Sequence, residues 1–423
     1  MNFFEVRGGE LFCEDVPLSL IAQTVGTPVY VYSAATLERH YSVFKNAFAA
    51  RRALIAFAVK ANSNLSVLST LARLGAGADT VSEGEIRRAL AAGVPPERIV
   101  FSGVGKTSQE LIFAIRTGVS EINVESEPEL DALNLLAGRL GVSPTLTIRV
   151  NPDIAAGGHD KIATGKNDNK FGVSISEAER LYAKASASAW LNPVGVACHI
   201  GSQISDLSPM REAFAKMRDL VLSLRAKGLT VERLDLGGGL GAPYFDQPDP
   251  PSPAEFAAVV EEALKGLQID LVFEPGRVIA ANAGVLLASV IHTHERPTGK
   301  RFLVVDAAMN DLVRPAMYDA YHDLRPVRTP RPGANLSAMD VVGPVCETGD
   351  TFSRDRVLPP LAPGDLVAFM TAGAYGATMS SEYNSRPLVP EVLVSGDKFA
   401  VVRPRPTYDE MLAREPLAPW LRD

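Results

Sequence analysis

The stretch Ala53-Leu-Ile-Ala-Phe-Ala-Val-Lys60-Ala-Asn-Ser-Asn64 joins an apolar run to one lysine and then to polar residues. An apolar run of this length is typical of a buried strand. Lys60 would then stand where the strand ends, at the mouth of a site. A desolvated lysine has a lowered pKa and a free amine, which suits a Schiff-base role. The alternative is a strand-end lysine that points to solvent, since most lysines are exposed.

Seven more apolar segments of strand length follow this one, and helical patterns alternate with them. The segments are 78–82, 98–102, 121–125, 145–150, 194–199, 233–236 and 271–273. Strands that alternate with helices predict right-handed βαβ units and a parallel sheet. Eight units between about residues 54 and 274 match a (β/α)8 TIM barrel. A doubly wound open sheet is the alternative architecture.

The pattern changes after about residue 277, where helical segments disappear. Short β-rich runs such as 301–305 and 366–370 alternate with Gly/Pro turns, which predicts an all-β domain. We therefore expect a barrel domain over 27–277 and a β domain over 278–423, with strands from 1–26 completing the latter. The polar, glycine-containing stretch 153–172 is predicted to be a mobile lid.

Bulk composition limits the possible partners and compartments. The 423 residues are 46% hydrophobic and 22% charged, with a formal net charge of −7. This composition is ordinary for a globular protein and gives no electrostatic reason to expect nucleic acid or an anionic membrane surface. The three cysteines are widely spaced, no Cys/His spacing resembles a zinc site, and no signal-peptide pattern is visible at the start. These features favour a reducing, cytoplasmic location and no metal.

Candidate site residues follow the predicted barrel strands, where such barrels carry their catalytic groups. His199-Ile-Gly-Ser-Gln203 ends the sixth strand, Gly237-Gly-Gly-Leu-Gly241 the seventh and Glu274-Pro-Gly-Arg277 the eighth. The glycine run is either a tight turn, a loose dinucleotide motif or, as we prefer here, a nest of N–H groups that binds one phosphate.

The other rim residues also have two interpretations each. His199 is either a core histidine or a ring that stacks on a flat ligand. Glu274 is either a loop carboxylate or the partner of a pyridine nitrogen, which would strengthen an electron sink. Arg277 is either a surface charge or a group that grips a carboxylate.

Together these motifs resemble the PLP-dependent group IV decarboxylases, which share a barrel resembling that of alanine racemase and a C-terminal β domain. The resemblance covers nearly the whole chain, with the motifs in the family's order. It extends to Gly343-Pro-Val-Cys346-Glu-Thr-Gly-Asp350, where Thr348 stands for the family's serine and keeps the hydroxyl. Without the resemblance, Cys346 would be interpreted as a small buried hydrophobe.

The resemblance implies a role for each matched residue. Lys60 would bond to pyridoxal 5'-phosphate, and Cys346 would be the proton donor. The cofactor-binding set would be Lys60, His199, Ser202, Gly239, Glu274, Gly276, Arg277 and Tyr375. The substrate-binding set would be Arg277, Arg314, Tyr318, Glu347 and Tyr375.

The branch of the family that the chain resembles most implies decarboxylation of meso-2,6-diaminopimelate to L-lysine. Cys346 and Glu347 would reach the partner subunit's site, so the expected assembly is a homodimer with shared active sites. The alternatives are a related enzyme acting on arginine, ornithine or carboxynorspermidine, an alanine racemase-type enzyme, and a non-catalytic homologue that binds partners. Glu347 favours diaminopimelate, because ornithine decarboxylase relatives tend to carry aspartate there.

Overall fold

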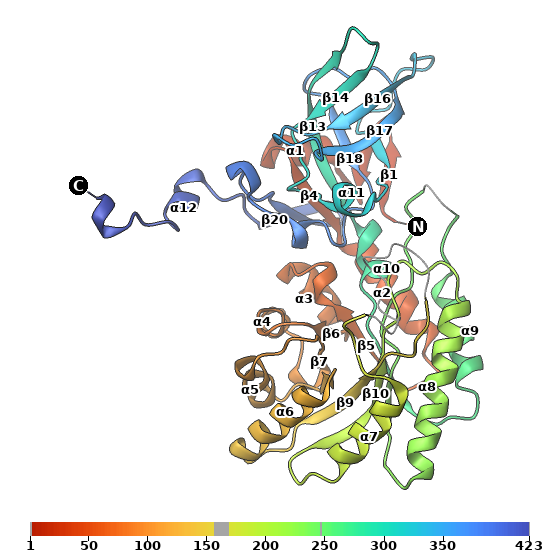
Figure 1. Ribbon diagram of the computed structural model, residues 1–423. Coiled ribbons are helices and arrows are strands. Elements are labelled where there is room, and N and C mark those ends of the chain that lie inside the picture. The colour runs from red at the N-terminus through yellow and green to blue at the C-terminus, as the bar shows by residue number, and fades with distance from the viewer. Residues whose placement is uncertain (1, 156–168, 246–247, 423) are drawn as a thin grey trace. The chain divides into compact units, whose positions relative to one another are not determined.

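The computed structural model describes residues 2–155, 169–245 and 248–422, so most of the predicted lid lies outside the described residues. The chain forms two compact units (Figure 1). The β unit contains Met1–Thr36, Tyr244–Asp246 and Ala281–Asp423, and the barrel unit contains Leu37–Pro243 and Gln247–Ala280. Each unit is described by itself below.

Eight parallel strands close into a barrel in the barrel unit, which confirms the predicted TIM barrel. The strands are β5 (Ala53–Ala58), β6 (Gly77–Thr80), β7 (Ile99–Phe101), β8 (Glu121–Val124), β9 (Thr145–Val150), β10 (Asn192–Cys198), β11 (Arg233–Asp235) and β12 (Asp270–Phe273). Pairing of β12 with β5 completes the circle. The C-terminal ends of all eight strands therefore lie at one rim of the barrel.

Helices follow the barrel strands, as the alternating pattern predicts. They are α3 (Leu65–Arg73), α4 (Glu83–Ala91), α5 (Ser108–Thr117), α6 (Glu127–Leu140), α7 (Ile175–Ser186), α8 (Ser208–Ala226), α9 (Pro253–Ala263) and α10 (Arg277–Ala280), with 3₁₀ turns η1 (Val59–Ala61) and η2 (Pro96–Arg98). One more helix, α2 (Ala34–Ala47), precedes the first barrel strand. Side chains of Ser82, Thr107 and Ser126 accept hydrogen bonds from the first turns of α4, α5 and α6. These N-caps fix where each helix begins, because they satisfy otherwise unpaired N–H groups.

The β unit is built on a mixed nine-stranded sheet. Its strands are β4 (Val29–Ser33), β13 (Gly284–Glu295), β14 (Arg301–Val305), β15 (Leu324–Pro326), β16 (Ser337–Val342), β17 (Thr351–Leu358), β18 (Leu366–Phe369), β19 (Glu391–Ser395) and β20 (Lys398–Arg403). β4 is central, pairing with β13 and β19. Residues 29–33, which fall inside the barrel range expected from sequence, therefore belong to this sheet.

The N-terminal residues join the β unit as a separate small sheet of β1 (Phe4–Arg7), β2 (Glu10–Cys13) and β3 (Val16–Pro17), followed by α1 (Leu18–Val25). Leu11 and Ile21 are fully buried in one core with Val31 and Leu287. These strands therefore pack on the core of the β unit as a sheet of their own.

The expectation that helices vanish after residue 277 was wrong in detail. Short helical segments occur at α11 (Arg314–Tyr318), α12 (Tyr408–Leu412), η4 (Ala281–Ala283), η5 (Ala377–Met379), η6 (Tyr383–Ser385) and η7 (Pro419–Leu421). None exceeds two turns, and such short segments carry almost no periodic signal in a sequence.

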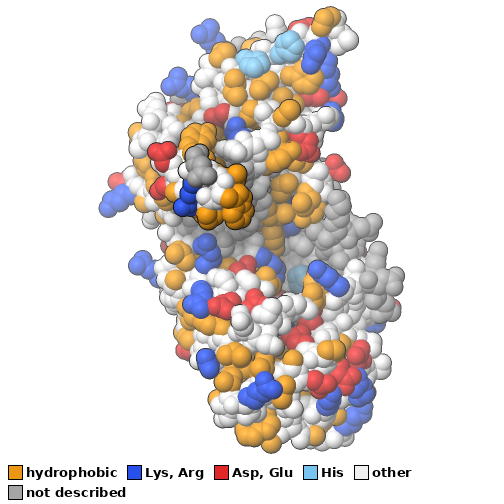
Figure 2. Space-filling view, turned by 60° about the vertical axis from the view of Figure 1, so that its left-hand side comes forward, with side chains coloured by type: hydrophobic (Ala, Val, Ile, Leu, Met, Phe, Trp, Pro, Cys, Tyr) orange, Lys and Arg blue, Asp and Glu red, His pale blue; other side chains and the backbone are white. Residues whose placement is uncertain are grey.

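The surface view intermixes acidic, basic and hydrophobic side chains over the visible face (Figure 2). Among the described residues, no helix combines the length and the apolar composition that crossing a bilayer requires.

Candidate active site

Lys60 lies at the barrel rim, in the 3₁₀ turn η1 that directly follows β5. Its Nζ atom is 2.6 Å from Oδ2 of Asp79, which belongs to β6. The Asp79 side chain is fully buried, and its second oxygen, Oδ1, has no hydrogen-bond partner among the described residues. The lysine side chain is 37% exposed. The Lys60 amine is thus paired with a buried carboxylate and stays partly accessible.

His199 follows β10 and presents an uncharged ring. The backbone N–H of Gly238 donates to its Nδ1 atom at 3.1 Å. Since Nδ1 accepts, the ring hydrogen must be on Nε2. Burial, followed by the positive charges of Arg149 and Lys60, holds the pKa of His199 well below its ordinary value. A neutral, flat imidazole of fixed tautomer suits stacking on another ring.

Two buried carboxyl groups, Asp235 at the end of β11 and Glu274 after β12, are hydrogen bonded to each other. Nδ2 of Asn123 lies 3.2 Å from Asp235 Oδ2 and 3.5 Å from Glu274 Oε1. Burial, then the charge of Asp235, raises the pKa of Glu274 well above its ordinary value. Burial, then the charge of Glu121, raises the pKa of Asp235 to about 7. Burial thus favours the protonated form of Glu274.

The glycine run after β11 is packed so closely that no side chain fits. A Cβ atom on Gly238 would lie 2.3 Å from the carbonyl oxygen of Glu274, and one on Gly239 would lie 2.6 Å from that of Gly201. Gly239 also has a φ of +108°, which residues with a side chain rarely adopt. The glycines thus allow three rim loops to approach one another.

The loops after β10, β11 and β12 are also tied together by hydrogen bonds. The Ile204 N–H donates to the Gly239 carbonyl at 2.9 Å. Arg277, the first residue of α10, donates from Nη2 and Nε to Ser202 Oγ at 3.1 and 3.3 Å. A guanidinium, a hydroxyl and backbone N–H groups are the donors that bind phosphate.

In the β unit, Arg314 and Tyr318 are the first and last residues of α11. Nη1 of Arg314 is 3.0 Å from Nε2 of His322, and its guanidinium carbon lies 4.8 Å from the centre of the Tyr244 ring. Tyr318 is half-buried, as is Tyr375, whose φ of +56° is unusual for a residue with a side chain.

Cys346 and Glu347 lie on an exposed loop that Asp350 organises. The buried Asp350 carboxylate accepts the N–H groups of Met309 and Val345, each at 2.7 Å. The Cys346 N–H donates to Asn384 Oδ1 at 3.1 Å. The thiol is free and exposed. An accessible thiol next to a carboxylate is thus held on a defined backbone.

Comparison with known proteins gives consistent matches. Residues 34–281 match the family described as "Pyridoxal-dependent decarboxylase, pyridoxal binding domain". The chain is similar to the diaminopimelate decarboxylases of Pseudomonas aeruginosa (50% identity, covering 99% of this chain and 100% of the relative) and Zymomonas mobilis (47%, covering 99% of each). The chain belongs to the diaminopimelate decarboxylase family of pyridoxal-dependent decarboxylases.

Solved structures of the family share the fold. The Helicobacter pylori diaminopimelate decarboxylase complexed with L-lysine has a TM-score of 0.90 and 43% identity, covering 94% of this chain and 98% of that one.

The two units of this family member divide the predicted site residues between them. The barrel unit brings Lys60, His199, Ser202, Gly239, Glu274, Gly276 and Arg277 to strand ends at the same rim. The β unit contains Arg314, Tyr318, Cys346, Glu347 and Tyr375.

Four polar residues of these clusters were missed from sequence: Asp79, Asn123, Asp235 and His322. Asp79 and Asp235 each interrupt an apolar strand close to its end. A charged residue in a buried strand is a usable signal, since such residues are rarely buried without a partner. For Asn123 and His322 the sequence holds no comparable signal.

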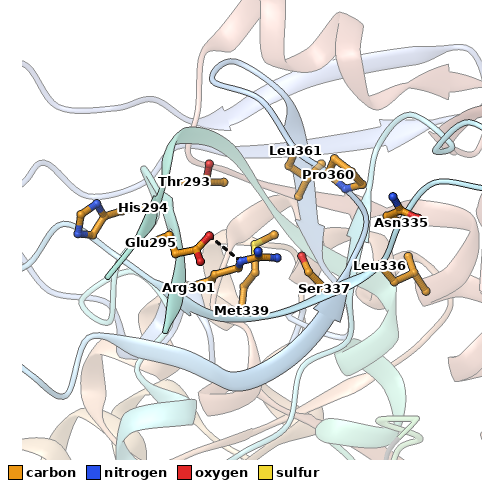
Figure 3. Close-up of a pocket in the computed structure, with 10 residues that line it drawn as sticks. All are labelled: Thr293, His294, Glu295, Arg301, Asn335, Leu336, Ser337, Met339, Pro360 and Leu361. Atoms are coloured by element: carbon orange, nitrogen blue, oxygen red, sulfur yellow. Dashed lines mark hydrogen bonds and ion pairs between the residues drawn. The ribbon is translucent and has the colours of Figure 1, made fainter. Parts of the chain in front are cut away.

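A pocket of about 360 Å³ also occurs in the β unit (Figure 3). It is lined by Thr293, His294, Glu295, Arg301, Asn335, Leu336, Ser337, Met339, Pro360 and Leu361. Glu295 and Arg301 form an ion pair of 2.9 Å across adjacent strands. The pocket contains none of the predicted site residues, and we assign it no role.

Proposed function

We propose that this protein decarboxylates meso-2,6-diaminopimelate to L-lysine with pyridoxal 5'-phosphate, the last step of lysine biosynthesis. The observation that carries the proposal is the full-length similarity to diaminopimelate decarboxylases, such as that of Pseudomonas aeruginosa at 50% identity over 99% of the chain. Known structures related to this chain, with L-lysine bound, support the same product.

The barrel rim fits pyridoxal phosphate. Lys60 offers an accessible amine beside a buried carboxylate, and His199 offers a flat neutral ring. Glu274 is a buried carboxyl group with a raised pKa, and the ring nitrogen of the cofactor could pair with it. Ser202, Gly239, Gly276 and Arg277, with Tyr375, would hold the phosphate. When bound, pyridoxal phosphate supplies a conjugated ring that takes up the electron pair left by departing carbon dioxide.

The residues of this chain would then handle the protons and the substrate. Lys60 Nζ would hold the cofactor until the substrate amine replaces it, and Asp79 would exchange a proton with that amine. The bond to the carboxylate breaks and a bond to hydrogen forms at the same carbon, with Cys346 Sγ as the proton donor. Arg277, Arg314, Tyr318, Tyr375 and Glu347 would contact the substrate.

A homodimer with shared active sites is part of the proposal. Cys346 and Glu347 would act at the partner subunit's site, as the family resemblance implies. Exposed apolar side chains near the C-terminus, including Leu412, Leu417 and Trp420, the last 78% exposed, support a surface that a second copy covers. Free thiols at all three cysteines support action in the cytoplasm.

A substrate panel tests the proposal. The protein loaded with pyridoxal phosphate is incubated separately with meso-diaminopimelate, ornithine, arginine and carboxynorspermidine, and carbon dioxide is measured. We expect release from diaminopimelate at least about a hundredfold faster, because loss of contacts to its distal amino-carboxylate costs roughly 3 kcal/mol. Faster release from another compound would overturn the substrate assignment.

A further inference from the structure

His322 joins the guanidinium of Arg314 to the backbone of the β unit. Its Nε2 atom is 3.0 Å from Nη1 of Arg314, and its Nδ1 atom is 2.9 Å from the carbonyl oxygen of Met370. Both side chains are almost fully buried, with Arg314 6% exposed and His322 3% exposed. The imidazole therefore bridges α11 and the residue that follows β18.

The two contacts determine the tautomer and the charge of the His322 imidazole. A carbonyl oxygen only accepts hydrogen bonds, so Nδ1 of His322 must carry the ring hydrogen. The Arg314 nitrogen only donates, so Nε2 must be the acceptor. The ring is thus neutral, with one tautomer fixed at both ends.

The ring of Tyr244 is a second neighbour of Arg314. It lies 4.8 Å from the guanidinium carbon and meets the His322 ring edge-on, with centres 5.7 Å apart and planes at 89°. These two neighbours contact the guanidinium from a ring nitrogen and a ring face. A guanidinium fixed in advance loses less conformational entropy when it binds a carboxylate.

We propose that His322 is a positioning residue that, with Tyr244, orients Arg314 toward the distal carboxylate of the substrate. This inference rests on the proposed function, in which Arg314 contacts diaminopimelate. The distal carboxylate is the one that remains in L-lysine after the other has left. Binding of the product therefore reports on the contact without turnover.

Two ligands isolate this contact. L-lysine carries the carboxylate, whereas cadaverine (1,5-diaminopentane) is the same diamine without it. Dissociation constants for both are measured by calorimetry on the protein loaded with pyridoxal phosphate. The ratio of the cadaverine constant to the lysine constant measures the carboxylate contact and cancels general damage to the site.

Two substitutions separate the two ends of the imidazole. His322→Asn places an amide donor near Nδ1, which keeps the bond to Met370 and removes the acceptor for Arg314. His322→Gln places an amide oxygen near Nε2, which keeps the acceptor for Arg314 and loses the bond to Met370. A purely structural role predicts that asparagine is tolerated better, whereas a positioning role predicts the reverse.

We expect His322→Asn to lower the ratio about tenfold and His322→Gln to leave it within about threefold of wild type. An unchanged ratio in both variants, or a larger loss with glutamine, would overturn the inference. If His322→Asn does not fold, the same ratio is measured for Tyr244→Leu and Tyr244→Phe. We expect the ratio to fall for the leucine variant only. Failure of the proposed function is a different result: the wild-type protein would then neither bind L-lysine nor release carbon dioxide from diaminopimelate.

Discussion

Replacing Asp235 with asparagine tests the buried carboxyl pair at the barrel rim. Asp235 and Glu274 are 1% and 8% exposed, and both have raised pKa values in the folded protein. Between its ordinary value and about 7, the Asp235 carboxyl of the folded cofactor-free protein therefore holds a proton that the unfolded chain lacks. This proton makes a contribution to stability that is lost as the pH rises through this window.

The number of protons that the folded protein retains sets the slope of the unfolding free energy against pH. The proton retained on Asp235 contributes a loss of about 1.4 kcal/mol per pH unit, and Asp235→Asn removes that contribution. Between roughly pH 5 and pH 7 the variant should therefore lose about 2.7 kcal/mol less than the wild type. The prediction concerns the slope, since asparagine also changes the hydrogen bond with Asn123.

Urea unfolding of the cofactor-free protein measures this slope. Trp190 lies in the barrel unit and Trp420 in the β unit, so a Trp420→Phe background makes tryptophan fluorescence specific for the barrel. Asp270→Asn is the control, because Asp270 begins the neighbouring strand β12 and its side chain is 38% exposed. The control should keep the wild-type slope. Equal slopes in the wild type and Asp235→Asn would refute the carboxyl pair.

Three further predictions concern the cofactor, the dimer and the glycine loop. Lys60→Ala should abolish both turnover and the absorbance of bound cofactor, and wild-type turnover would contradict its assignment. Co-expressed Lys60→Ala and Cys346→Ala subunits should recover about a quarter of wild-type activity, because half of the dimers are mixed and each mixed dimer has one intact site of two. No recovery in confirmed mixed dimers would place both residues in one subunit's site. Gly239→Ala should destabilise the barrel by about 1–3 kcal/mol in thermal unfolding, whereas Gly105→Ala, with open space around it, should not.

The barrel and most of its rim could be predicted because they depend on local pattern. Each strand is a short apolar run, and Lys60, His199 and Glu274 follow such runs directly. Once the topology is known, every strand end is assigned to the same rim. This prediction required no knowledge of which distant residues contact one another.

The remaining features depend on contacts that no local pattern encodes. Asp235 lies beside Val272 in the register of β11 with β12, which places it next to Glu274. β4 pairs with β13, more than two hundred residues later, so its apolar pattern fits a barrel equally well. His322 acts through a ring whose two ends contact Arg314 and Met370. These partners become visible only when the chain is folded.

Product analysis of meso-diaminopimelate turnover tests the central claim most directly. The protein loaded with pyridoxal phosphate is incubated with diaminopimelate, and carbon dioxide and L-lysine are both quantified over time. The proposed reaction predicts equal amounts of the two products, and no products from Lys60→Ala treated in the same way. Absence of L-lysine from the wild-type reaction, with cofactor demonstrably bound, would contradict the proposed function.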